Sequence, residues 1–118
     1  MIFVDPSIWV DHLRFENATL VTLLEGEQVL THPVVIGELA CGQLRNRREI
    51  LRLLATLPTA TVARDDEVLR FLEGRRLFGR GIGWLDAHLL ASAVLSHARL
   101  LTLDKRLSRL AKELRVAA

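Results

Sequence analysis

The sequence has few of the residues that mark disulfide-rich or membrane-spanning proteins. Its single cysteine, Cys41, cannot form an internal disulfide, and its small apolar neighbours predict a buried structural thiol. Tyrosine is absent and aromatic residues make up only 5% of the chain, so the core must consist mainly of Leu, Val, Ile and Ala. No apolar run approaches the roughly 20 residues of a membrane span, and residues 1–5 lack the basic start of a signal peptide. These absences indicate a cytoplasmic protein.

The net positive charge is also small, although arginine is unevenly distributed along the chain. The 16 Lys and Arg residues against 14 Asp and Glu give a net charge of +2, which does not by itself indicate nucleic-acid binding. The 118 residues contain no linker, repeat or low-complexity segment, which predicts a single domain over 1–118. Two arginine clusters are either solvated helix faces or phosphate contacts: Arg45, Arg47, Arg48 and Arg52, and Arg70, Arg75, Arg76 and Arg80.

Short apolar segments alternate with helical patterns along the chain. Residues 2–4 are typical of a strand buried on both faces, and Asp5-Pro6 is typical of a helix start. Further strands are expected at 28–31, 59–63 and 100–103. Helices are expected at about 17–25, 33–44, 46–57, after Asp65, at 84–97 and at 104–114, with 79–83 as a glycine-rich loop. This alternation predicts an α/β sandwich whose parallel sheet is covered by helices on both faces.

Four acidic residues occupy positions that bring them toward one edge of this sheet. Asp5 and Asp104 each follow a predicted strand directly, and ligands of parallel sheets bind at the carboxyl ends of the strands. Asp86 lies on the apolar stripe of its helix, where an unpaired charge is costly. Glu38 lies in the middle of a helix among small apolar neighbours.

The aspartates have a simpler explanation one at a time, since Asp5, Asp86 and Asp104 could each cap a helix. Capping does not explain Glu38, nor does it explain why these residues converge on one edge. Four carboxylates in one pocket would repel one another strongly unless a cation neutralised them. Oxygen ligands suit Mg²⁺ or Mn²⁺, so the sequence predicts a divalent-metal site.

The acidic residues lie in motifs that resemble the PIN-domain nucleases, and within them the VapC-type toxins of bacterial toxin–antitoxin pairs. The resemblance covers nearly the whole chain, in the family's order: Val4-Asp5-x-Ser7-x-Trp9, the helical Glu38, Asp86-Ala87-x-Leu89-x-Ala91 and Leu101-Thr102-x-Asp104. It implies a PIN-like α/β/α sandwich in which Asp5, Glu38, Asp86 and Asp104 are catalytic and hold divalent metal. The hydroxyls of Ser7 and Thr102 would support that site. The C-terminal residues 115–118 barely permit the edge strand with which the family usually ends.

The resemblance also implies an activity and partners. It implies an endoribonuclease that hydrolyses RNA phosphodiester bonds with Mg²⁺ or Mn²⁺, leaving a 5′-phosphate and a 3′-hydroxyl. A cognate antitoxin would neutralise it, and a homodimer is expected. Helical leucines give apolar surface beyond the needs of one small core, as a dimer interface would: Leu20, Leu23, Leu24, Leu51 and Leu54.

Two other functions compete with this hypothesis. A catalytically silent PIN-like module could bind RNA or protein, although such a module has no reason to keep four repelling acids. A phosphotransfer domain could use Asp5 as its nucleophile, but that chemistry typically needs a second aspartate at position 7, which is Ser7. Gly79-x-Gly81-x-Gly83 lacks the spacing of a phosphate-binding loop. The histidines lack zinc spacing: His12, His32, His88 and His97.

Overall fold

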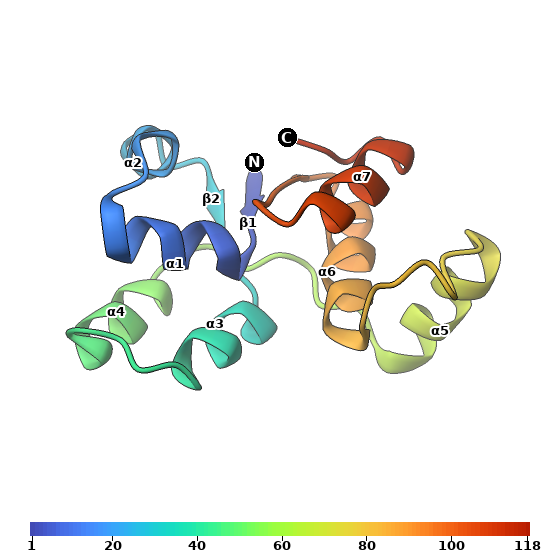
Figure 1. Cartoon of the computed structure of the whole chain (residues 1–118), viewed down its shortest axis with the longest axis horizontal. Helices are drawn as coiled ribbons and strands as arrows, with labels where there is room; N and C mark the ends of the chain where they lie inside the picture. The colour runs from blue at the N-terminus through green and yellow to red at the C-terminus, as the bar shows by residue number, and fades with distance from the viewer.

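The centre of the fold is a short parallel sheet of three strands in the order β2-β1-β3 (Figure 1). The computed structural model describes residues 1–118. The strands are β1 (Ile2–Val4), β2 (Val29–Leu30) and β3 (Arg99–Leu101). Phe3 of β1 lies opposite Leu30 on one side and Leu100 on the other. Phe3 and Val4 are fully buried, as expected for a central strand that is covered on both faces.

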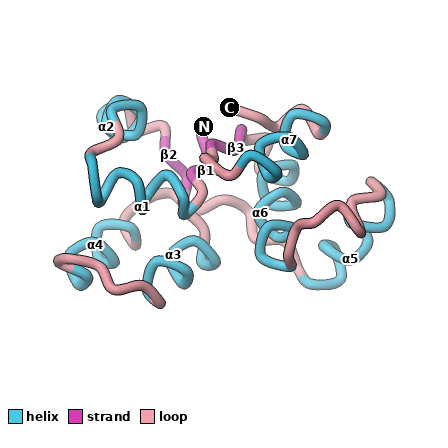
Figure 2. The backbone as a smooth tube through the Cα atoms, in the orientation of Figure 1, coloured by secondary structure: helices cyan, strands magenta, loops and turns pink.

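Seven helices flank the sheet in two groups. They are α1 (Pro6–Phe15), α2 (Ala18–Glu25), α3 (Pro33–Ala40), α4 (Arg47–Leu54), α5 (Asp65–Gly74), α6 (Trp84–Leu95) and α7 (Lys105–Glu113). Helices α1 to α4 gather on one side of the strands and α5 to α7 on the other, as Figure 2 shows. The predicted α/β/α sandwich with a parallel sheet is therefore confirmed. None of the seven helices combines the length and apolar character needed to cross a membrane.

The starts of α1 and α7 follow the predicted capping residues. Asp5 accepts a hydrogen bond from the Ser7 backbone at 3.1 Å, and Pro6 occupies the first position of α1. Asp104 caps α7 in the same way through the Leu107 backbone at 3.0 Å. At α5 the predicted start after Asp65 is wrong, because Arg64 occupies the cap position. The Arg64 backbone amide donates a hydrogen bond to Glu67 Oε1 at 2.9 Å. Asp65 is instead the first residue of that helix.

The predicted strand at 59–63 is only one bridge, between Thr31 and Thr59. Beyond that bridge the backbone finds side-chain partners on α6 in place of a neighbouring strand. The Thr61 amide donates to Ser96 Oγ at 2.8 Å, and the Ala63 amide donates to Ser92 Oγ at 3.4 Å. Since these donors are already used, no sheet ladder continues there.

Several predicted boundaries also differ. The helix expected to reach residue 44 ends at Ala40, whose carbonyl accepts two hydrogen bonds from the Arg47 guanidinium, each 3.1 Å long. The helix expected at 46–57 ends at Leu54. The helix expected to reach His97 ends at Leu95, because His97 adopts a left-handed backbone with φ of 51°. The third strand covers Arg99–Leu101 rather than 100–103.

The C-terminus forms a minimal edge to the sheet. Ala117 makes a single parallel bridge with Leu100. The Leu100 amide donates to the Val116 carbonyl at 2.6 Å, and the Ala118 amide donates to the Leu100 carbonyl at 3.0 Å. A trace of the expected edge strand therefore forms beside β3.

The core is aliphatic, as the composition predicts, and it uses leucines that were expected to lie at an interface. Leu20 and Leu54 are fully buried, and the remaining three leucines of that group pack against the core. The prediction of surplus apolar surface is therefore wrong for Leu20 and Leu54, whereas Leu23, Leu24 and Leu51 are only partly buried. The prediction for Cys41 is also wrong: the thiol is exposed, because Cys41 follows the exposed Gly37 and Glu38 at helical spacing and so lies on the outer face of α3.

Candidate active site

The strand ends bring two of the predicted acids to the same edge of the sheet. Asp5 follows β1 and Asp104 follows β3, separated from its last residue by Thr102 and Leu103. Because β1 and β3 are adjacent and parallel, their carboxyl ends meet. The Asp5 amide donates to the Leu101 carbonyl at 3.0 Å, which fixes the point where the chain leaves the sheet.

All four predicted carboxylates line one cavity of about 200 Å³ at this edge. Asp86 comes from the first turn of α6, and Glu38 comes from the middle of α3. The other lining residues are Pro6, Ser7, Val34, Leu85, Leu89 and Leu107. Thus two residues that follow strands and two residues of helices line the same cavity, although Asp5 and Asp104 are 99 positions apart in the sequence.

The four carboxylates differ in exposure. Asp5 is the deepest, with 6% of its surface accessible, whereas Asp86 is half-buried. Glu38 and Asp104 are exposed. The cavity therefore has an acidic floor and an acidic rim that is open to solvent.

Asp5 is held in place by hydroxyl groups on both neighbouring segments. Its Oδ2 accepts hydrogen bonds from the Ser7 hydroxyl and from Thr102 Oγ1, the latter at 2.9 Å. Ser7 Oγ in turn accepts from the Leu103 amide at 2.9 Å, and Thr102 Oγ1 accepts from the Asp104 amide at 3.0 Å. This network leaves Asp5 Oδ1 free to interact with a ligand. Ser7 lines the cavity, whereas Thr102 lies behind Asp5.

The electrostatic cost of the site is greatest at Asp86. Burial raises the pKa of the Asp86 carboxyl, and the charges of Asp104, Asp5 and Glu38 raise it further. A backbone hydrogen bond with Gly83 lowers that pKa and so partly opposes these effects. The ionised form of Asp86 is therefore disfavoured by the fold, and a cation in the cavity would favour it.

The donor set fits a hard divalent cation, because it consists only of carboxylate and hydroxyl oxygens. No three of the chain's acidic, histidine or cysteine side chains are close enough together to form a complete ligand set as they stand. Mg²⁺ usually retains several waters and binds through one or two carboxylates, so it needs no such dense cluster.

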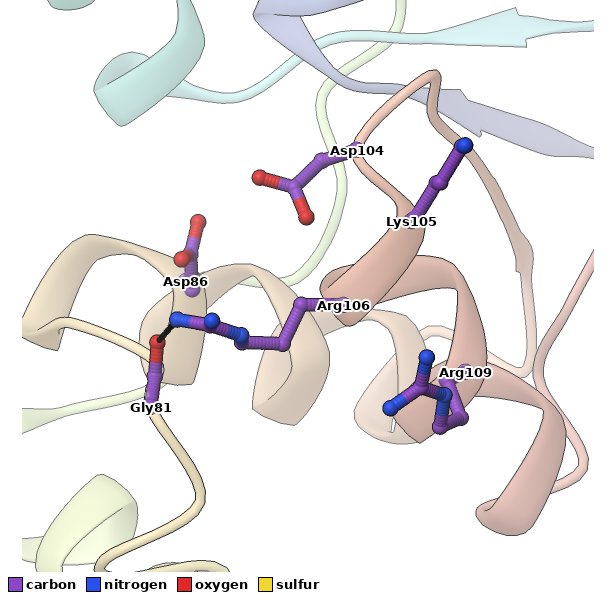
Figure 3. A pocket seen from close by; sticks show the side chains of 6 residues that line it. All are labelled: Gly81, Asp86, Asp104, Lys105, Arg106 and Arg109. Atoms are coloured by element: carbon purple, nitrogen blue, oxygen red, sulfur yellow. Dashed lines mark hydrogen bonds between the residues drawn. The ribbon is translucent and has the colours of Figure 1, made fainter.

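A row of cationic side chains lies beside this cavity, and the sequence pattern did not predict it. Lys105, Arg106 and Arg109 of α7 line a cleft that also contains Asp86 and Asp104 (Figure 3). The two arginine clusters noted in the sequence do not include these residues. All members of those two clusters are exposed. The sequence did contain an indication of this row. Lys105 directly follows Asp104, and Arg109 lies four residues after Lys105, which places both cations on one helix face.

The glycine-rich segment 79–83 is a loop, as predicted, and it packs against α7. Arg80 forms an ion pair with Glu113 at 2.8 Å. Arg106 Nη1 donates to the Gly81 carbonyl at 2.8 Å. The loop therefore forms one wall of the basic cleft and is not itself a phosphate-binding turn.

Comparisons with known proteins agree with this arrangement. A family model described as "PIN domain" matches residues 2–113. The chain is also 49% identical over 118 residues to Ribonuclease VapC32 of Mycobacterium tuberculosis, in strain CDC 1551 / Oshkosh and in strain ATCC 25618 / H37Rv. Each alignment covers 99% of this chain and 95% of the relative. The chain therefore belongs to the PIN-domain family and, within it, to the VapC type that its acidic motifs resemble.

Proposed function

We propose that residues 1–118 form a single PIN-like domain that acts as a divalent-metal-dependent endoribonuclease, the toxin of a toxin–antitoxin pair. The observation that carries the proposal is the cavity lined by Asp5, Glu38, Asp86 and Asp104. The name of the relative, a ribonuclease, supports RNA as the substrate. Hydrolysis of an RNA phosphodiester bond is the reaction class that an open, acidic, metal-binding cavity suits.

In this proposal the four carboxylates hold Mg²⁺ or Mn²⁺. The ion would activate water for in-line attack on phosphorus and offset charge on the phosphate oxygens. Asp5 lines the cavity, and Ser7 and Thr102 restrain its Oδ2, which leaves Oδ1 for the ion. Asp86 supplies a carboxylate whose charge the fold compensates only in part, through a backbone hydrogen bond with Gly83. Glu38 is exposed, so its side chain can adjust to the ion and to the substrate, whereas Asp104 Oδ1 is held by the Leu107 amide and its Oδ2 would meet the ion.

The proposal includes partners and a location. A cognate antitoxin would neutralise the enzyme, and a basic side chain of that antitoxin would complement the acidic cavity. We also propose a homodimer and action in the cytoplasm, where RNA and antitoxin are both present. The VapC name of the relative supports the antitoxin.

A catalytically silent module is the alternative. It would keep the same fold and bind RNA or protein without cleavage. The raised pKa of Asp86 argues against it, because a silent module gains nothing from a carboxylate that burial and three like charges destabilise. The phosphotransfer alternative is weaker, since that chemistry typically needs a second aspartate at position 7, where this chain has Ser7.

The experiment is incubation of the purified protein with total RNA, with Mn²⁺ or with EDTA. We expect cleavage with Mn²⁺ and none with EDTA. Asp5→Asn or Asp86→Asn should lower the rate by more than the roughly 10- to 100-fold loss typical of residues that only orient a ligand. Glu25→Gln, which neutralises an exposed carboxylate on α2, is the control and should cleave normally.

Circular dichroism must show that each variant remains folded. Cleavage that persists undiminished in EDTA would contradict the metal mechanism. Absence of cleavage under every condition, with native dichroism, would favour the silent module.

A further inference from the structure

Helix α7 places a basic cleft directly beside the acidic cavity. We infer that Arg106 and Arg109, with Lys105 at the edge, bind a backbone phosphate of single-stranded RNA next to the phosphate that is cleaved. This inference rests on the proposed ribonuclease function and adds a substrate subsite to it. It concerns residues of α7 that lie outside the four acidic motifs.

The two hollows adjoin. The basic cleft has a volume of about 490 Å³ and no hydrophobic lining residue. Asp86 and Asp104 line both it and the acidic cavity, so they form the boundary between the two. Figure 3 shows Arg106 extending beneath Asp86 toward Gly81, with Arg109 one helical turn further along α7. A nucleic-acid strand in the cleft would therefore continue directly to the four carboxylates.

The stability of α7 does not account for these cations. Lys105 and Arg106 are the first two residues of the helix, directly after its cap Asp104. The amino end of a helix carries a partial positive charge, so cations there are unfavourable and acidic residues are preferred. The hydrogen bond with the Gly81 carbonyl accounts in part for Arg106, whereas Lys105 has no such partner, and a bound anion would account for both cations.

The cations of the cleft are also not neutralised by ion pairs. No salt bridge involves Lys105, Arg106 or Arg109, although two carboxylates line the same cleft. By contrast, the nearby Arg80 is paired with Glu113 at 2.8 Å. Arg109 is close enough to Glu113 to help lower the pKa of that carboxyl, after the larger effect of Arg80. The guanidinium of Arg109 is exposed and retains its donors for a phosphate.

Arg106 is positioned by the loop. Its Nη1 donates to the Gly81 carbonyl at 2.8 Å, which uses one of its five N–H donors. Gly81 has φ of 82°, and a Cβ at this position would lie 2.7 Å from that same nitrogen. Glycine is therefore required at 81 both for the backbone conformation and for the path of Arg106 across the cleft.

The cations of the cleft would offset the repulsion between the RNA phosphates and the acidic cavity in the proposed reaction. RNA brings negative charge to a cavity that is already lined by four acids. A metal ion offsets the charge only at the phosphate that it contacts, whereas the neighbouring phosphate still faces Asp86 and Asp104. Cations on the adjoining wall would attract that neighbour and hold the strand across the site.

The test measures RNA binding without cleavage. A fluorescein-labelled 20-nucleotide RNA of random sequence is titrated with protein in EDTA, and anisotropy gives the dissociation constant at several salt concentrations. Removing one phosphate contact to a single strand should reduce the slope of log K against log salt by about 0.7, which corresponds to about fivefold weaker binding at 0.1 M salt. We expect this change for Arg109→Ala, and Arg109→Lys should restore most of the slope.

Two further variants sharpen the result. Arg14→Ala removes an exposed arginine at the far end of α1 and should bind RNA as the unmodified protein does. Gly81→Ala keeps every charge but displaces the Arg106 guanidinium, so it should weaken binding without changing the net charge. Melting curves would show that both variants are folded.

The outcomes separate this inference from the proposed function. RNA binding by Arg109→Ala with an unchanged slope and affinity overturns the phosphate site, even if the protein cleaves RNA. Failure of the unmodified protein to bind the RNA overturns it as well. A reduced slope in a protein that never cleaves RNA supports the cleft and rejects the nuclease. If the cleft instead binds an acidic protein segment, Arg109→Ala will leave RNA binding unchanged, which counts against the inference.

Discussion

At the scale of single residues, the fold treats the charges of Asp5 and Asp86 differently. Asp5 is deeper, yet two hydroxyls and a backbone amide donate to its Oδ2. Asp86 receives less compensation, and burial together with the other three acids raises its pKa. The cost of ionisation, mainly from burial and then from the like charges, therefore falls on Asp86, whereas Asp5 is the better-anchored ligand position.

His32 is another buried polar residue, and its ring has a structural role. It is fully buried, and its Nδ1 accepts a hydrogen bond from the Val34 amide at 2.9 Å, which caps α3. In the neutral ring the proton therefore lies on Nε2, which faces Ser92 Oγ at 3.0 Å. The ring also stacks on Phe3 of β1, with centroids 5.6 Å apart.

The buried ring makes the protein sensitive to acid. Burial, and then the charge of His88, lowers the pKa of His32 from 6.5 to about 4. The unfolded chain thus binds more protons between these values, so the free energy of unfolding should fall as pH drops from 6.5 toward 4. The full contribution is present above pH 6.5 and amounts to at most about 3 kcal/mol.

The check is urea unfolding at pH 7 and at pH 4.5, for the unmodified protein and for His32→Asn. Asparagine can still cap α3 but does not titrate, so this variant should lose less stability on acidification. Carboxylates titrate in both proteins and cancel in the comparison. Equal losses in the two proteins would show that His32 does not carry the effect.

At the scale of elements, the site depends on a hydroxyl that connects the ends of β1 and β3. Thr102 Oγ1 donates to Asp5 at 2.9 Å and accepts from the Asp104 amide at 3.0 Å. Thr102→Val keeps the shape and removes both bonds. It should cost about 1 kcal/mol of stability and lower RNA cleavage by roughly 10- to 100-fold, as for other residues that orient a ligand.

Thr102→Ser keeps the hydroxyl and serves as the matched control, which should retain most of the activity. Thermal melts and initial cleavage rates measure both effects. If Thr102→Val cleaves RNA at the normal rate, the hydroxyl does not position Asp5.

Which elements could be predicted depends on the range of the interactions that define them. The starts of α1 and α7 were predictable, because Asp5, Pro6 and Asp104 act within three residues of themselves. The conformation of residues 59–63 was not predictable, because their backbone amides bond to Ser92 and Ser96, which are distant in the sequence. A strand-like composition cannot reveal such partners.

The two halves of the candidate site show the same contrast. Its acids were predictable because two of them follow strands and the other two lie on helix faces with apolar neighbours. The basic cleft was not, since it forms only when α7 packs against a loop 25 residues away and Arg106 reaches Gly81. The burial of Cys41 was predicted wrongly because its small apolar neighbours do not show which face of α3 it shares, and that face, with Gly37 and Glu38, is exposed.

At the scale of the whole molecule, the expected dimer remains a prediction. The leucines first assigned to an interface lie in or against the core. Large apolar side chains are exposed elsewhere, including Phe15 on α1, Leu53 on α4 and Leu69 on α5. These positions lie on different helices, so they do not by themselves define one dimer face.

The central claim is that the four acids form one metal site. It predicts a stability pattern that depends on metal. Without metal, neutral substitution should relieve repulsion, so Asp86→Asn and Glu38→Gln should both melt higher than the unmodified protein in EDTA. Asp86→Asn should gain more, because burial is the largest cause of its raised pKa, whereas Glu38 is exposed and is the last of the three charges acting on Asp86.

The most direct measurement is a set of paired thermal melts of these three proteins in EDTA and in millimolar Mn²⁺. In EDTA the variants should melt higher by a few degrees, since about 1 kcal/mol shifts a domain of this size by several degrees. In Mn²⁺ the order should reverse, because the unmodified protein gains roughly 2.7 kcal/mol at a hundredfold excess over Kd and the variants gain less. If both variants are less stable in EDTA and Mn²⁺ shifts all three proteins equally, the carboxylates are structural and the four acids do not form a metal site.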